Sequence, residues 1–261
     1  MDSIKLVFHY LSMHLKVSLE YKISFILSTI SQILILFVEL FTVYSLFSKF
    51  QLLSIYNINE LLLGFGIVWL GFSFAEMFFR GFDEFPLLII KGDFDLLLIK
   101  PRSIYMQIFG SNICYAKISR VIVSLILVIY SSIHIIDSFN LLRVIMLINM
   151  FIGSVIIFLS VFILGASMSF VTIQGLEIIN IITNGSKQVS QYPIKIYNKA
   201  FRFIFTFIIP IALINYYPIS YLNNNSSNLL LLVYPLVSIL FLIFSIFIFK
   251  LGMNKYSSTG S

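Results

Sequence analysis

Charged residues are scarce in this chain. They make up 11% of its 261 residues, whereas 59% of the residues are apolar. Soluble domains carry about one quarter charged residues, and a soluble fold of this length could not bury so much apolar surface. Several stretches without charge reach the roughly 20 residues that a helix needs to cross a bilayer. The composition therefore excludes an ordinary soluble domain and predicts an all-α integral membrane protein.

Cysteine and histidine are also rare. The single cysteine, Cys114, excludes an internal disulfide and a metal cluster built from several cysteines. The histidines His9, His14 and His134 lack the His-Glu-x-x-His spacing of zinc proteases. No Gly-x-Ser-x-Gly nucleophile motif occurs either. We therefore expect no metal site and no catalytic residue.

A phosphate-binding loop is absent as well. The pattern Gly-x-x-x-x-Gly-Lys-(Ser/Thr), whose backbone amides and lysine hold nucleotide phosphates, does not occur in the sequence. The chain is therefore not expected to hydrolyse ATP by itself, and we expect no cofactor in it. Any ATP and Mg would be bound by a separate partner.

Basic residues outnumber acidic ones, and the formal net charge is +6. Nucleic-acid binding requires basic residues gathered on a water-exposed face, but here they stand at the ends of apolar runs. That placement is typical of signals for membrane orientation and of contact with lipid headgroups. We therefore expect membrane lipid, and no nucleic acid, as a partner.

Five apolar runs predict membrane spans. They lie between Lys22 and Lys49, Glu60 and Arg80, Val121 and Ile136, Arg143 and about Phe170, and Leu229 and Phe249. The third span could begin earlier in the sequence if the long side chains of Lys117 and Arg120 snorkel to the interface.

A sixth crossing must come from the region between the fourth and last spans, where two arrangements compete. In the first, the run Phe203–Leu222 crosses the membrane. In the second, the more polar stretch Ser167–Ser190 crosses, and the run carrying Pro210 and Pro218 forms a hairpin that dips into the outer leaflet. Both arrangements give six crossings with both termini in the cytoplasm.

The positive-inside rule and the prolines favour different arrangements. The first keeps Lys195, Lys199 and Arg202 in the cytoplasm, as the rule prefers, whereas the second places them outside. Pro210 and Pro218 are awkward in a simple span because proline interrupts a helix. The residues alone leave both arrangements open.

Two segments outside the spans have helical patterns. Residues 1–22 place apolar and polar residues on separate helical faces, which is typical of a helix lying in the membrane interface or packed on the protein. Residues 80–102 hold eight charges between the second and third spans. Within that insert, Gly92 breaks the chain, Asp93 can cap a helix and Pro101 ends it. The pattern predicts a short cytoplasmic helix, which in many membrane proteins is only a connector.

Two motifs resemble type 2 ABC exporter permeases of the bacterial six-span subfamily. The first is Lys91-Gly-Asp-Phe-Asp-Leu-Leu-Leu-Ile-Lys-Pro-Arg102, which resembles the family pattern Gly-x-(Leu/Phe)-Asp-x-x-Leu-x-(Lys/Arg)-Pro. The second is Gln191-Tyr-Pro-Ile-Lys-Ile-Tyr-Asn-Lys-Ala-Phe-Arg202, followed by Ile209-Pro-Ile-Ala-Leu-Ile-Asn-Tyr-Tyr-Pro218. With the predicted spans, the resemblance covers nearly the whole chain.

The resemblance implies a single transmembrane permease domain over residues 1–261. It implies a bacterial cytoplasmic membrane, a cytoplasmic ABC ATPase as partner, and a second permease chain in a homo- or heterodimer. It also implies that residues 191–222 form a re-entrant hairpin. The ATPase-coupling element would consist of Gly92, Asp93, Phe94, Asp95, Leu98, Lys100 and Pro101. The expected function is export of an amphiphilic, lipid-like, peptide or drug substrate.

Glu39 and Glu76 lie within predicted spans, where a carboxylate is costly, so both are candidates for a translocation path or a subunit interface, together with Pro210 and Pro218. Glu76 can instead pair with Arg80 one turn away. Glu39 has no such neighbour and could line a cavity or bond another helix. Two alternative functions remain: an ion-driven secondary transporter using both carboxylates, and a non-transporting immunity or sensor subunit.

Overall fold

The computed structural model describes residues 3–49, 57–136, 140–172, 175–223 and 228–256. Every regular element within these ranges is helical. The long helices are α2 (Lys22–Lys49), α3 (Ile58–Phe78), α8 (Ile118–Ile135), α9 (Leu141–Met168) and α14 (Val237–Lys255). A 3₁₀ turn, Tyr115–Lys117, precedes α8, and two more, Leu229–Leu232 and Tyr234–Leu236, precede α14.

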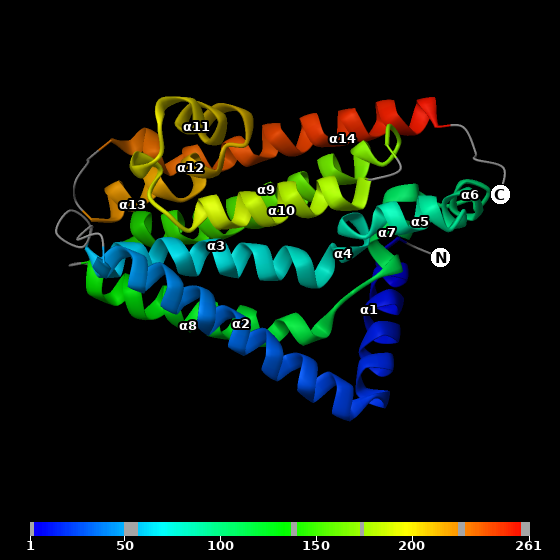
Figure 1. Cartoon of the computed structure of the whole chain (residues 1–261), viewed down its shortest axis with the longest axis horizontal. Helices are drawn as coiled ribbons and strands as arrows, with labels where there is room; N and C mark the ends of the chain where they lie inside the picture. The colour runs from blue at the N-terminus through cyan, green and yellow to red at the C-terminus, as the bar shows by residue number, and fades with distance from the viewer. Residues whose placement is uncertain (1–2, 50–56, 137–139, 173–174, 224–227, 257–261) are drawn as a thin grey trace.

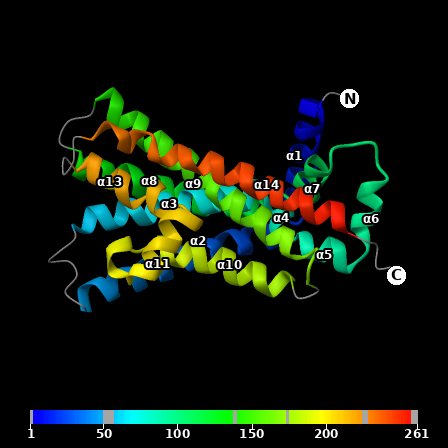
Figure 2. The ribbon, with the colours of Figure 1, turned by 90° about the horizontal axis from the view of Figure 1, so that it is seen from above.

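These five long helices are apolar enough to cross a membrane, and a bent pair of shorter helices brings the possible number of spans to six. Each of the five apolar runs predicted from the sequence coincides with one of them, so those predictions are confirmed. The helices lie alongside one another in one bundle (Figures 1 and 2). The protein is a multi-pass helical membrane protein.

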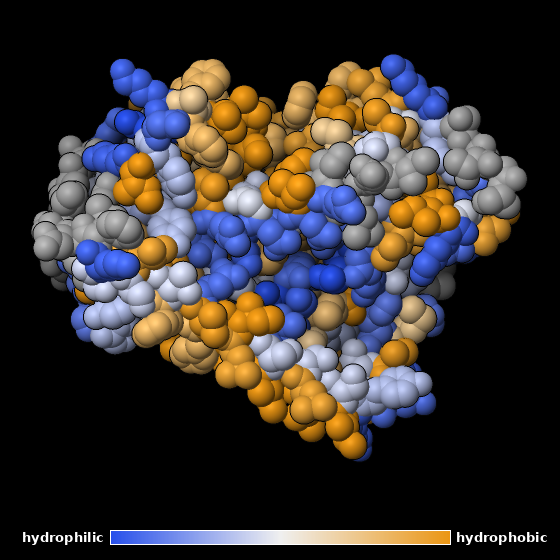
Figure 3. Space-filling view, in the orientation of Figure 1, coloured by the Kyte–Doolittle hydropathy of each residue, from blue (hydrophilic) through white to orange (hydrophobic). Residues whose placement is uncertain are grey.

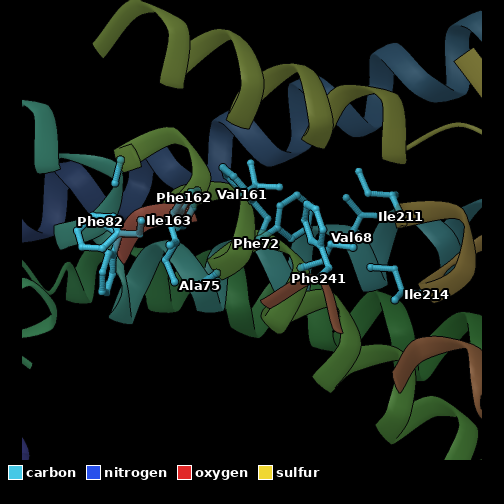
Figure 4. Packing of buried hydrophobic residues seen from close by; sticks show 14 of the residues in the cluster. Val68, Phe72, Ala75, Phe82, Val161, Phe162, Ile163, Ile211, Ile214 and Phe241 are labelled. Carbon is cyan, nitrogen blue, oxygen red and sulfur yellow. The ribbon is translucent and has the colours of Figure 1, made fainter. Parts of the chain in front are cut away.

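The centre of the bundle is α3. Buried residues make up 83% of its most apolar window, compared with 6% for α2 at the edge. Close packing of α3 depends on a small residue at Gly71, where an added Cβ would lie 2.1 Å from Ser154 Oγ on α9. Small residues allow membrane helices to approach this closely. Figure 4 shows the core that results, in which residues of α3, α9, α12 and α14 meet.

The region after α9 contains one straight helix and a bent segment. The helix α10 (Gly175–Ser190) runs back along α9 to the opposite end of the bundle (Figure 1). There the chain forms α11 (Lys199–Phe203), a π-helical turn (Ile204–Ile208), α12 (Ile211–Ile214) and α13 (Tyr216–Leu222). The parts before and after Pro210 are bent by 70°, at a residue that lacks a backbone N–H.

The end of the bundle away from α11–α13 carries both ends of the described chain and the segment between α3 and α8 (Figures 1 and 2). That segment forms four short helices: α4 (Arg80–Asp83), α5 (Phe85–Ile90), α6 (Asp93–Leu98) and α7 (Ile104–Ser111). The expected short helix is therefore present, but the expected cap is wrong. Gly92, with φ of 73°, occupies the position before α6, and Asp93 lies in its first turn without a capping bond.

The first helix, α1 (Ser3–Glu20), packs on the protein and also exposes apolar residues. His14 Nε2 donates a hydrogen bond to the Gly110 carbonyl oxygen at 2.9 Å. Tyr115 Oη donates to the Leu11 carbonyl oxygen, also at 2.9 Å. Phe8 and Leu19 on the same helix are exposed. One face of α1 thus contacts α7 and the turn before α8, while apolar side chains remain free to enter an interface.

Candidate functional site

Glu76 is the centre of a buried charge cluster at the end of α3. Its carboxylate accepts hydrogen bonds from Lys117 Nζ at 2.6 Å and from Arg80 Nη1 at 2.5 Å. Arg120 Nη2 also pairs with it. The side chains of Glu76 and Arg120 are 9% and 4% exposed. The third span does begin earlier, at Tyr115, but Lys117 and Arg120 do not snorkel to the interface, because both turn inward to neutralise this carboxylate.

Two further carboxylates balance the cations of this cluster. Arg80 Nε donates to Glu84 Oε1 at 2.8 Å, and Arg80 Nη1 lies 3.9 Å from Asp83 Oδ2. Asn112 Nδ2 donates to the other Glu84 oxygen at 2.5 Å. Buried charges are tolerated when they are paired and hydrogen-bonded. The cluster therefore ties α3, α4, α8 and the end of α7 together.

Asp83 is a member of this cluster that lies outside the spanning helices, and burial shifts the ionisation of its carboxyl. Burial raises the pKa of its carboxyl from the ordinary 3.8 to about 6. The Arg80 guanidinium opposes this shift, while the neighbouring carboxylates Glu76 and Glu84 reinforce it. Asp83 therefore gains or loses its charge near pH 6.

A second ion pair joins α2 to α10. Lys187 Nζ lies 2.9 Å from Glu39 Oε1, and Gln191 Nε2 donates to Glu39 Oε2 at 2.6 Å. The Lys187 side chain is 7% exposed and that of Glu39 is 26% exposed. Of the roles considered for Glu39, the structure shows bonding to a neighbouring helix. Sequence reasoning missed Lys187 as its partner, although a lone lysine in a helix facing apolar neighbours was a usable signal.

Trp69 and Phe72 of α3 lie between the two charge clusters. Lys187 Nζ is 4.4 Å from the Trp69 ring centroid and 5.2 Å from that of Phe72. Arg120 Cζ is 5.1 Å and 5.9 Å from the same two centroids. Cation–π contacts of this length stabilise a cation that has been removed from water. The aromatic rings of α3 thus connect the α2–α10 ion pair with the Glu76 cluster.

The outward side of α10 carries four polar residues, with the exposed Ile181 among them. Glu177, Asn180, Asn184 and Gln188 are exposed, and their spacing of three to four residues places them in one stripe. Figure 3 shows hydrophilic residues gathered in a band across the middle of this face, with hydrophobic residues above and below. Such side chains are costly against lipid tails. This stripe therefore requires water or another chain beside it.

The two candidate prolines lie in the bent segment, away from the charge clusters. Pro210 stands at the 70° break and Pro218 lies within α13, and both are buried. The segment is joined to α10 by Asn215, whose Nδ2 donates to the Ser190 carbonyl oxygen at 3.0 Å. The structure therefore does not bring the prolines together with Glu39 or Glu76.

The predicted coupling residues divide into an exposed surface and a buried anchor. Leu98, Lys100 and Pro101 are exposed, with Leu96 and Ile99 beside them. Phe94 is fully buried, and its ring centroid lies 5.1 Å from that of Phe85 and 5.0 Å from that of Tyr256. Gly92, Asp93 and Asp95 are half-buried between them. Phe94 therefore fixes the segment, and the other side chains form its outer surface.

Gln107 holds this segment in place and was not predicted from the sequence. Its Nε2 donates to the Leu97 carbonyl oxygen at 3.0 Å and to that of Arg102 at 3.1 Å. The side chain is buried on α7. One amide thus closes the loop from the end of α6 to the start of α7. A single polar residue in an apolar helix gives only a weak signal for such a role.

The fold and the site define a polytopic helical membrane protein with paired charges inside its bundle and an ordered segment at the end that carries both termini. Residues 33–260 match the profile of the family described as ABC-2 family transporter protein. The chain therefore belongs to this family and is a transmembrane permease of an ABC transporter. Such permeases have no ATPase site of their own and work with an ATPase subunit. Neither the comparison with curated proteins nor that with solved structures yields a match.

Proposed function

We propose that the chain is the permease half of an ATP-driven exporter that moves an amphiphilic, lipid-like, peptide or drug substrate. The observation that carries this proposal is the polar stripe of α10, because α10 runs between the two ends of an otherwise apolar bundle. The polar side chains there provide one wall of a water-accessible path. A second permease chain, identical or related, supplies the facing wall.

The proposed orientation places the protein in a bacterial cytoplasmic membrane with both termini and α4–α7 in the cytoplasm. Six crossings are then formed by α2, α3, α8, α9, α10 and α14. The segment α11–α13 is a re-entrant hairpin at the outer side. The 70° bend and the common location of its parts at one end of the bundle support this arrangement over a straight fifth span.

The cytoplasmic ATPase docks on the outer surface of α6 and the turn after it. This surface combines apolar side chains, among them Ile99 at 78% exposure, with the charged Lys100. ATP and Mg are bound by that partner, and Phe94 transmits the contact into the bundle through its aromatic neighbours. The ring centroid of Phe94 lies 5.7 Å from that of Phe170, which follows α9 in the chain.

The path opens and closes by movement of α10 relative to α2. The Glu39–Lys187 pair and the Trp69 contact hold these helices in the present arrangement. Separation of α10 from α2 would expose both charges to the path, where water stabilises them. Two arrangements of similar energy are what alternating access requires. An ion-driven carrier is less well supported, because Glu39 and Glu76 are already paired with cations.

Cysteine labelling with a water-soluble maleimide tests the path. Cys114 is replaced by serine, and single cysteines are placed at Asn184 on the stripe and at Ile126, an exposed apolar residue of α8. We expect labelling of Asn184→Cys to change when ATP and the co-purified ATPase are added. Ile126→Cys should stay unlabelled. Equal labelling at both positions would contradict a path along α10.

Affinity purification of the tagged chain tests the assembly. We expect a cytoplasmic ATPase and a second permease chain to co-purify, with ATP hydrolysis that responds to substrate. A chain that transports in liposomes without an ATPase would instead be a gradient-driven carrier. Stable binding to the ATPase without substrate-dependent hydrolysis would indicate an immunity or sensor subunit.

A further inference from the structure

The end of the bundle that holds α11–α13 carries basic residues which the proposed orientation places outside. Lys195, Lys199 and Arg202 are all exposed there. Basic residues are depleted in outer loops because their retention in the cytoplasm sets membrane orientation. Their presence at the outer end therefore calls for a function, and the inference below rests on the proposed orientation.

Two of these residues form a stripe with a third, uncharged one. Lys199, Arg202 and Thr206 follow one another at spacings of three and four residues, which places them on one face of the helical segment Lys199–Ile208. Within the described ranges, no ion pair or hydrogen bond of the Lys199 or Arg202 side chain is present. Both cations are therefore available to an anion from outside.

This stripe leads into an apolar groove between the bent segment and α14. The groove has a volume of about 390 Å³. It is lined by Thr206, Phe207, Ile208, Pro210, Leu213, Val237, Leu240, Phe241 and Phe244. Apart from the Thr206 hydroxyl, every lining side chain is apolar. Arg202 lies one helical turn before Thr206, roughly 6 Å along the helix axis, so a cation stands close to the mouth of the groove.

We propose that this groove binds one anionic phospholipid of the outer leaflet. The phosphate is held by Lys199 and Arg202, the Thr206 hydroxyl contacts the glycerol region, and an acyl chain occupies the groove along α14. Phe203 and Phe207 are exposed, with ring centroids 5.2 Å apart, and anchor the segment among the neighbouring lipids. A cationic mouth above an apolar groove matches the chemistry of a phospholipid with net negative charge.

Occupation of the groove would hold α11 and α12 against α14 and so fix the bent segment beside the outer end of α10. Lipid composition would then influence the path through Asn215, which joins the same segment to Ser190 at the end of α10. This regulatory consequence is separate from the binding itself, which requires neither ATP nor the ATPase.

Native mass spectrometry of the full chain tests the proposal, with equimolar palmitoyl-oleoyl phosphatidylglycerol and phosphatidylcholine as probes. We expect preferential retention of phosphatidylglycerol. Each basic residue near a membrane surface contributes about fivefold to anionic lipid binding, so Lys199→Gln with Arg202→Gln should reduce the preference by roughly tenfold or more. The matched control is Lys250→Gln with Lys255→Gln, at the far end of α14, which should keep it.

A second variant tests the groove independently. Leu240 lines the groove and is 68% exposed, so Leu240→Trp fills space with little effect on folding. This variant should lose both lipids while remaining monodisperse in size-exclusion chromatography. Arg202→Lys, which keeps the charge, reports on the site if the double glutamine variant fails to fold, and it should retain the preference.

Four results would overturn the proposal. They are equal binding of both lipids by the unchanged chain, an undiminished preference in the double glutamine variant, an unchanged affinity in Leu240→Trp, and competition by millimolar inorganic phosphate as strong as that by lipid. The last would indicate a free-phosphate site. Failure of the exporter function would appear separately, as loss of ATPase association with the lipid preference intact.

Discussion

The ammonium group of Lys187 on α10 lies 2.9 Å from the carboxylate of Glu39 on α2, although 148 residues separate them in the sequence. The same ammonium lies 4.4 Å from the centroid of the Trp69 ring on α3. One lysine therefore connects the loosely packed edge helix α2 with the central helix α3. Because α2 buries few other residues, this contact is a large part of what holds it against α10.

Glu39→Gln should destabilise the protein more than its partial exposure suggests. The substitution leaves the Lys187 charge buried without a carboxylate, which costs about 3 kcal/mol. Thermal unfolding in detergent should show the loss. Lys187→Met combined with Glu39→Leu should recover most of it, because both charges are then removed. If Glu39→Gln keeps its stability, the pair does not hold α2. Transport that is unchanged at normal expression would remove Glu39 from the mechanism.

The stability of the α4 region should fall as the pH rises from about 4 to about 6. The pKa of Asp83 is raised to about 6 in the folded protein. Below pH ~4 the carboxyl is neutral in both the folded and unfolded states, so its full contribution to stability is present. Between these values the unfolded state ionises first, and about 3 kcal/mol at most is lost.

Asp83→Asn should flatten this pH dependence and raise the unfolding temperature at pH 7.5. Glu177→Gln, which removes a carboxylate from the exposed stripe of α10, is the matched control and should leave the pH profile as it is. Thermal unfolding followed in steps from pH 4 to pH 8 measures both. A profile for Asp83→Asn that overlays that of the unchanged protein would contradict the burial of this carboxyl.

Gly81→Ala should disrupt the joint between α4 and α7. An added Cβ at Gly81 would lie 1.9 Å from the Ile108 carbonyl oxygen, which is backbone and cannot move aside cheaply. We expect a loss of about 1 to 3 kcal/mol or more. At Gly185 on α10, no atom other than those of its own stretch of helix lies within 4 Å of an added Cβ. Gly185→Ala is therefore the control and should gain about 1 kcal/mol from helix propensity.

Asp93→Lys and Pro101→Ala should weaken binding or stimulation of the ATPase without unfolding the bundle. Asp93 is half-buried in the first turn of α6, and Pro101 is exposed at the turn after it. Co-purification of the ATPase and its hydrolysis rate give the readout. Glu20→Lys makes the same charge reversal at the end of α1 and should have no effect. Unchanged association in both α6 variants would move the docking site elsewhere.

The sequence by itself determined the membrane class, the five apolar spans and the short helix between Gly92 and Pro101. Each of these follows from local rules: a window of apolar residues long enough to cross lipid, or a helix bounded by glycine and proline.

Only the tertiary structure decided which charges meet. Lys117 and Arg120 pair with Glu76 across 41 and 44 residues of sequence, and Lys187 pairs with Glu39 across a longer interval. Likewise, α10 is shorter than the five apolar helices and exposes polar residues, and whether those residues meet lipid, water or protein depends on its neighbours. Hydropathy describes whether a residue prefers water or lipid, whereas packing determines which partner a buried polar group binds. For that reason the spans could be read from composition, and the paired charges and the stripe of α10 could not.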